Sequence, residues 1–157
     1  MRVKPEGVRR MNISPDILAY AAYITEQRQL LHAIPEPSYQ EHKTRAHIWA
    51  ELEKAGVDKL DTFAKTGIRA VVYAQDQTQK LPVYGFRADM DALSIEEKTG
   101  LPFASQHTGH MHACGHDGHM SILLVFANWL CANREQLRCN VVLIFQPAKN
   151  HRAVRCP

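Results

Sequence analysis

The chain has 157 residues, of which 45% are hydrophobic and 22% charged, and its formal net charge is +3. This composition is typical of a soluble α/β domain and excludes a disordered tail, because a chain this long and this apolar can bury a sizeable core. Basic residues concentrate only in the first ten positions, so no continuous basic face predicts nucleic-acid binding.

The amino-terminal region has no apolar run as long as a signal peptide or a membrane span. Asp16 and the run from Glu26 to Arg28 interrupt its first hydrophobic stretch. We therefore expect a cytoplasmic protein with no membrane partner. Residues 1–12 are expected to form an unstructured basic leader, with translation starting at Met1 or Met11.

Four cysteines lie late in the chain without paired spacing, and a cytoplasmic protein of this size needs no disulfide. Thiols are therefore expected at all four. They are Cys114, Cys131, Cys139 and Cys156.

Two helices are predicted in the first third of the chain. Ser14 followed by Pro15 is typical of a helix start, and apolar residues then recur at helical spacing to about His32. Ser38 lies three residues before Glu41, the spacing of a capping box, and a second helix with apolar residues at i, i+4 and i+7 follows it up to a glycine.

The pattern changes to alternation from Ile68 to Ala74, and a second candidate strand covers residues 83–88. We expect these two strands to be neighbours in one sheet. A helix with one apolar face follows through residues 120–131, and the continuous apolar run from Val141 to Phe145 predicts a strand covered on both faces. This order of elements favours a layered α/β domain with its site at the strand ends.

The densest concentration of potential ligands lies between His107 and His119, which holds five of the nine histidines. Imidazole and thiolate bind zinc-like ions well, and Cys114 and His116 place two such donors two residues apart. Glycines beside them allow a loop to bend tightly. The alternative, histidines that decorate a solvated loop, is disfavoured because a thiol lies inside the cluster.

Two further polar segments follow predicted strands. Carboxylates at Asp89 and Asp91 arrive as one strand ends, although acidic residues also commonly cap a following helix. The segment Phe145-Gln146-Pro147 closes the apolar strand, where the proline ends pairing.

Four ordered segments, residues 30–42, 86–93, 111–120 and 143–148, together resemble the aminoacylase and carboxypeptidase-type metallopeptidase family. The resemblance extends over residues 13–148 and is to the hippurate-hydrolase and indoleacetyl-amino-acid-hydrolase branch. It implies the amino-terminal part of a zinc-peptidase-like catalytic domain, an incomplete three-layer α/β/α fold that lacks the inserted dimerisation, or lid, domain. The homodimer surface of the family is accordingly expected to be missing.

The resemblance also implies a chemistry. In the family, two divalent ions (Zn, Mn, Co or Ni) polarise an amide carbonyl and activate a water molecule to cleave an N-acyl amino acid. Cys114 and His116 match the first two metal ligands. Asp91 and Asp117 match positions that orient ligands without binding metal.

The chain departs from this pattern after Ala148. The family continues with two glutamates, a general base and a metal ligand, whereas this chain has Lys149 and Asn150. A lysine at its ordinary pKa cannot take a proton from water, so no general base is predicted here. Residues 149–157 are expected to be an aberrant tail, and our hypothesis is a frameshift through loss of one base from the codons after Ala148.

Three interpretations of the function follow. The first is a metal-dependent N-acyl-amino-acid amidohydrolase. The second, which we expect for this 157-residue molecule, is a non-catalytic remnant that binds metal weakly. The third is a small dedicated metal-binding or interaction protein. An incomplete sheet would also leave apolar edges uncovered, which predicts a tendency to aggregate.

Overall fold

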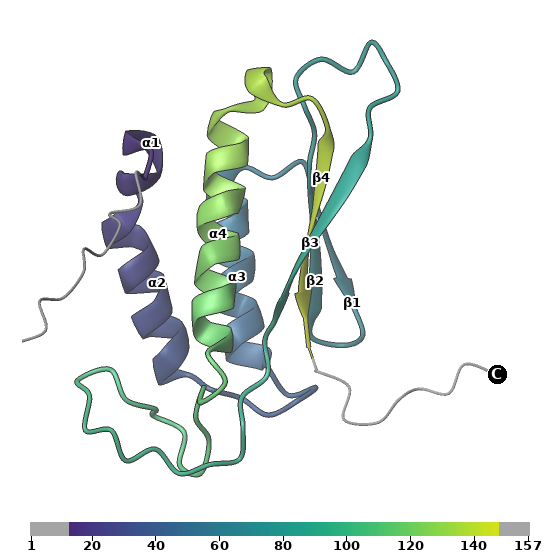
Figure 1. Ribbon diagram of the computed structural model, residues 1–157. Helices are drawn as coiled ribbons and strands as arrows, with labels where there is room; N and C mark the ends of the chain where they lie inside the picture. Colours follow the sequence, from purple (N-terminus) through teal and green to yellow (C-terminus); the bar gives the residue numbers. More distant parts are fainter. Residues whose placement is uncertain (1–12, 148–157) are drawn as a thin grey trace, which may run out of the picture.

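The computed structural model describes residues 13–147, and helices pack against one face of a four-stranded sheet (Figure 1). The predicted leader 1–12 and the predicted tail 149–157 lie outside the described residues. The elements in chain order are α1 (Pro15–Leu18), α2 (Ala21–Ala33), α3 (His42–Ala55), β1 (Lys59–Phe63), β2 (Gly67–Val72), β3 (Val83–Asp89), α4 (His116–Ala132), the 3-10 helix η1 (Arg134–Gln136) and β4 (Asn140–Gln146).

The first predicted helix is divided in two. Pro15 occupies the first turn of α1 as expected, but the Ser14 side chain makes no capping hydrogen bond. The backbone N–H of Tyr20 donates to Ile17 at 3.1 Å, and α2 begins one residue later. Ile17 and Leu18 are largely exposed, so little packing opposes this break.

The predicted capping box at the start of α3 is wrong. The carboxylate of Glu36 instead accepts hydrogen bonds from the backbone N–H groups of Lys43 at 3.1 Å and Thr44 at 2.9 Å. Ser38 and Glu41 cannot cap the helix because their side chains form tertiary hydrogen bonds. A carboxylate from the preceding loop therefore satisfies the donors that a helix start leaves open.

The strand order is β1-β2-β4-β3, which corrects the prediction that residues 68–74 and 83–88 form neighbouring strands. β4 is antiparallel to β2 and parallel to β3, and α4 makes the crossover between the two parallel strands. β4 takes the central place because it is the most apolar of the strands. β1 was not predicted, since its residues are exposed or half-buried and do not alternate as a strand would.

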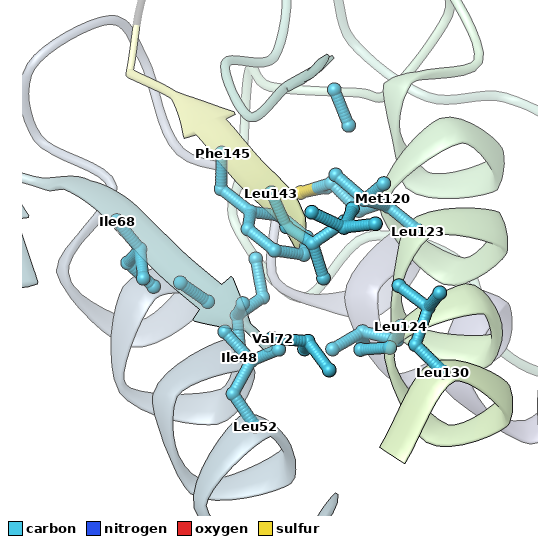
Figure 2. Close-up of a cluster of buried hydrophobic side chains, with 14 of the residues drawn as sticks. Ile48, Leu52, Ile68, Val72, Met120, Leu123, Leu124, Leu130, Leu143 and Phe145 are labelled. Atoms are coloured by element: carbon cyan, nitrogen blue, oxygen red, sulfur yellow. The ribbon is translucent and has the colours of Figure 1, made fainter. Parts of the chain in front are cut away.

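The core lies between the sheet and helices α3 and α4 (Figure 2). Leu143 and Phe145 of β4 are fully buried against the helices, whereas Val142 and Ile144 on the other face are half-buried. The prediction that β4 is covered on both faces is wrong for the described residues, because the helices cover only the face that carries Leu143 and Phe145. The side chains that complete this core come from three elements: Ile48 and Leu52, Ile68 and Val72, and Met120, Leu123, Leu124 and Leu130.

Several elements meet at one end of the molecule, where β3 and β4 end, α2 ends, and α3 and α4 begin (Figure 1). The backbone N–H of Met90 donates to Gln146 O at 2.8 Å and joins the two strand ends. The long loop between β3 and α4 lies at the same end and carries the predicted ligands. The predicted layered α/β fold is confirmed, and the predicted ligands lie at the end of the molecule where β3 and β4 end. No helix within residues 13–147 is long and apolar enough to cross a membrane.

Candidate metal centre

His116 is the first residue of α4, and Gly115 before it adopts a left-handed conformation with φ of 79°. This turn directs the buried imidazole toward Asp91, in the loop after β3. Its Nδ1 lies 2.7 Å from Asp91 O and 3.3 Å from Asp91 Oδ1. The hydrogen bond with Asp91 raises the pKa of His116, and burial opposes that shift. With Nδ1 donating to Asp91, the lone pair of His116 is on Nε2, the nitrogen available to a metal.

Asp91, for which the resemblance implies an orienting role, contacts His116 and is itself held in place. It is 4% exposed, and the hydroxyl of Ser38 donates to its Oδ2 at 2.9 Å. The neighbouring Ala92 donates its backbone N–H to Glu36 O at 2.8 Å. The loop between α2 and α3 therefore fixes the carboxylate that in turn fixes His116.

Asp117 is the most deeply buried residue of the group at 1% exposure. Its Oδ2 lies 2.8 Å from His32 Nδ1 and accepts a hydrogen bond from Arg28 Nε at 3.3 Å. Its position in the first turn of α4 also places its charge at the positive end of the helix dipole. Its second oxygen, Oδ1, is buried and has no hydrogen-bond partner among the described residues.

His112 was missing from the predicted site residues. It is 4% exposed, and neither ring nitrogen has a hydrogen-bond partner within residues 13–147. Burial lowers the pKa of His112 to about 4, against an opposing effect of the Asp117 charge. The ring is thus neutral at neutral pH, which is the form that binds metals. The sequence signal that could have identified His112 is its position two residues before Cys114.

Cys114 differs from its predicted partner His116, because its thiol side chain is exposed. Cys131 and Cys139 are also free thiols, as expected, while Cys156 lies outside the described residues. In the part of the chain that the structure describes, no three His, Cys, Asp or Glu side chains form a group that could hold a metal ion. The structure therefore brings Asp91 to His116 but does not assemble a closed ligand set.

The chemistry of the available donors nevertheless fits a divalent cation. Both nitrogens of His112 and Oδ1 of Asp117 are buried atoms without hydrogen bonds in the described structure. Burial of such atoms is unfavourable unless a ligand, water or ion satisfies them. A pocket of about 430 Å³ lies beside Asp117, and Arg28, Phe103 and Gly115 are among the residues that line it.

His32, Glu36 and Glu97 are structural members of this region that sequence reasoning had not assigned a role. His32 Nε2 lies 3.3 Å from Glu97 Oε1, and Glu97 Oε2 accepts the backbone N–H of Ser105 at 2.6 Å. His32 and Glu36 belong to a segment that carried the family resemblance without a function. No spacing rule predicts the contacts of His32, because its partners Glu97 and Asp117 lie 65 and 85 positions away.

Comparison with known proteins shows which proteins this chain is similar to. Residues 85–149 match the family described as "Peptidase family M20/M25/M40". An N-acetyl-L-cysteine deacetylase of Bacillus subtilis is 45% identical over 122 residues, which are 78% of this chain and 29% of that protein. An N-acetyldiaminopimelate deacetylase of Streptococcus pneumoniae is 40% identical over 133 residues, 83% of this chain and 34% of that protein.

A solved structure agrees with the sequence matches. The crystal structure of a dinuclear metal-binding peptidase of the M20 family from Bacillus subtilis superposes with a TM-score of 0.77 at 39% identity. The superposition covers 84% of this chain and 36% of the Bacillus subtilis chain. The present chain thus spans about a third of the length of the relatives it matches.

Proposed function

We propose that the chain, whose residues 85–149 match Peptidase family M20/M25/M40, forms the first part of the metal centre of an amidohydrolase that acts on N-acyl amino acids. The observation that carries the proposal is the position of His116, buried at the start of α4 with Nδ1 held by Asp91. A histidine fixed in this way presents one nitrogen lone pair in a defined direction, as metal-binding histidines do.

Cys114 and His116 are the side chains that would hold the metal, and Asp91 and Asp117 would orient them. The ions supply Lewis-acid polarisation of the substrate carbonyl and a more acidic water. The contribution of this chain would be to direct Nε2 of His116 toward the metal, with Nδ1 held by Asp91, and to supply the sulfur of Cys114. Two divalent ions, from among Zn, Mn, Co and Ni, suit such a mixed donor set.

The substrate class rests on the names of the relatives. Both are deacetylases of N-acetylated amino acids, one acting on N-acetyl-L-cysteine and one on N-acetyldiaminopimelate. These names support an N-acyl amino acid as the substrate of the proposed amidohydrolase. We propose acetyl amino acids as the first compounds to test, followed by the benzoyl and indoleacetyl compounds that the resemblance of the motifs indicates.

A second candidate, metal binding without hydrolysis, is favoured by one feature of the sequence. Lys149 and Asn150 occupy the positions where the resemblance places two glutamates, and a lysine cannot serve as the general base. Both residues lie outside the described part of the chain. We propose that the 157-residue chain binds a divalent ion through Cys114 and His116 but does not turn over substrate.

The test is a Co²⁺ titration of the purified chain, followed by assays with a panel of N-acetyl amino acids. Thiolate coordination gives a charge-transfer band in the near ultraviolet, which should be lost in Cys114→Ser and weakened in His116→Ala. Cys131→Ser is the matched control because Cys131 is a free thiol at the far end of α4. A band that survives Cys114→Ser would refute the proposed ligand. Hydrolysis by the unsubstituted chain would refute the second candidate.

A further inference from the structure

We propose that His32 is a positioning residue of the metal centre, which holds Asp117 and thereby the first turn of α4 that carries His116. This inference rests on the proposed function, because it assigns a role to a residue of the same site that touches neither of the proposed ligands. Its basis is a buried network in which the imidazole lies between two carboxylates.

The first half of the network joins α2 to α4. His32 and Arg28 lie one turn apart on α2 and therefore face the same side of that helix. Both contact the same oxygen, Asp117 Oδ2, at 2.8 Å from His32 Nδ1 and 3.3 Å from Arg28 Nε. Asp117 directly follows His116 in α4, so these contacts set the position of the helix start at the ligand.

The second half joins α2 to the loop that carries the predicted ligands. His32 Nε2 lies 3.3 Å from Glu97 Oε1, and Glu97 in turn holds the backbone of Ser105. The ring edge-packs on Phe103, with centroids 5.7 Å apart at 81°. Each ring nitrogen thus faces one carboxylate oxygen, so the imidazole bridges Asp117 and Glu97.

The two contacts to Asp117 are not equivalent. The His32 side chain is 5% exposed, whereas that of Arg28 is 58% exposed. A hydrogen bond shielded from water is stronger than one at the surface, so His32 contributes most of the hold on Asp117. Because Asp117 Oδ1 has no partner in the described structure, the Oδ2 contacts alone determine how the carboxylate is oriented.

Removal of His32 should therefore loosen the ligand geometry without removing any proposed ligand. His32→Gln retains one amide donor but cannot bridge Asp117 and Glu97. We expect it to weaken Co²⁺ binding by about 10- to 100-fold, the usual effect of removing an outer partner of a metal ligand. The charge-transfer band at saturating metal should keep its stoichiometry, because Cys114 remains.

The experiment measures the Co²⁺ dissociation constant by competition with a chelator, at a temperature where circular dichroism shows each variant folded. His42→Gln is the matched control, since His42 is an exposed histidine at the start of α3. A residue that only supports the fold would lower the unfolding midpoint but leave the dissociation constant of the folded protein unchanged. If His32 acts through Asp117, adding His32→Gln to Asp117→Asn should change the Co²⁺ dissociation constant little further.

The outcomes separate the two proposals. If the unsubstituted chain shows the thiolate band and His32→Gln binds Co²⁺ as tightly as His42→Gln, the role of His32 is refuted and the proposed metal centre stands. If the unsubstituted chain shows no thiolate band, both are refuted. Should His32→Gln not fold, Glu97→Gln is the second variant to test. It keeps the size of the side chain and one acceptor oxygen for His32 Nε2. A smaller loss of affinity is then expected, and unchanged affinity overturns the inference.

Discussion

Acidification should destabilise the metal-free chain through His112 specifically. Burial holds the pKa of this imidazole at about 4, below the ordinary value of about 6.5. The folded state therefore resists protonation of His112 while the unfolded state accepts the proton. The stability that depends on a neutral His112 is fully present above the unfolded pKa, and it is lost as the pH falls toward the folded pKa.

The size of the effect follows from the two pKa values. Between pH 7 and pH 5 the unfolded chain takes up most of one proton at this position, whereas the folded chain takes up little. Linkage then gives a loss of about 2 kcal/mol over that interval. His112→Gln, which cannot titrate, should not show this part of the pH dependence, whatever its stability at pH 7.

The assay is urea unfolding followed by circular dichroism, with a chelator present, at pH 7 and pH 5 for both proteins. Other groups titrate in both chains, so the informative quantity is the difference between the two pH-dependent losses. We expect the unsubstituted chain to lose about 2 kcal/mol more than His112→Gln. Equal losses would refute the assignment of His112 as a buried neutral imidazole. Saturating Co²⁺ should not be used, because binding to the folded state would add its own stabilisation.

Three further predictions concern the fold. Burial raises the pKa of Glu41, so the ionised carboxylate opposes folding. Glu41→Gln should therefore raise the urea midpoint at pH 7 but not at acidic pH, where Glu41 is protonated. Gly56 ends α3 at φ +80° in open space, so Gly56→Ala should cost about 1 kcal/mol from backbone strain, and an unchanged midpoint would contradict this. Leu143→Ala should lower thermal stability by about 2–5 kcal/mol, and by more than Ile144→Ala, since only Leu143 is fully buried.

Elements with a strong local signal could be predicted from the sequence. The apolar face of α4 and the continuous run of β4 specify their type through burial, because each must cover apolar surface. β1 could not be predicted, since Lys59–Phe63 pairs at the sheet edge through backbone hydrogen bonds to β2 and buries little. The neighbour of β2 was also beyond local reasoning, because strand order depends on which strand reaches the centre of the sheet.

The candidate site also has a part that local sequence predicts and a part that it does not. The spacing of Cys114 and His116 identified the loop, because donor type and glycine flanks are local properties. The partners of that loop come from α2, where His32 contacts Glu97, and from the α2–α3 connection, through Glu36 and Ser38. Ser38 shows why local patterns fail here: its spacing is that of a helix cap, yet its hydroxyl has a stronger tertiary acceptor in the buried Asp91 carboxylate.

The distribution of polar groups is itself an argument for function at this end of the molecule. The core between the sheet and helices α3 and α4 is built from apolar side chains, whereas His112 and Asp117 bury three polar atoms without hydrogen bonds in the described structure. Each such atom costs about 1–3 kcal/mol if nothing satisfies it. The two side chains are close enough for the charge of Asp117 to affect the pKa of His112. A fold optimised for stability alone would pair or replace these atoms, so their place near His116 supports the proposal that this end of the molecule binds a ligand.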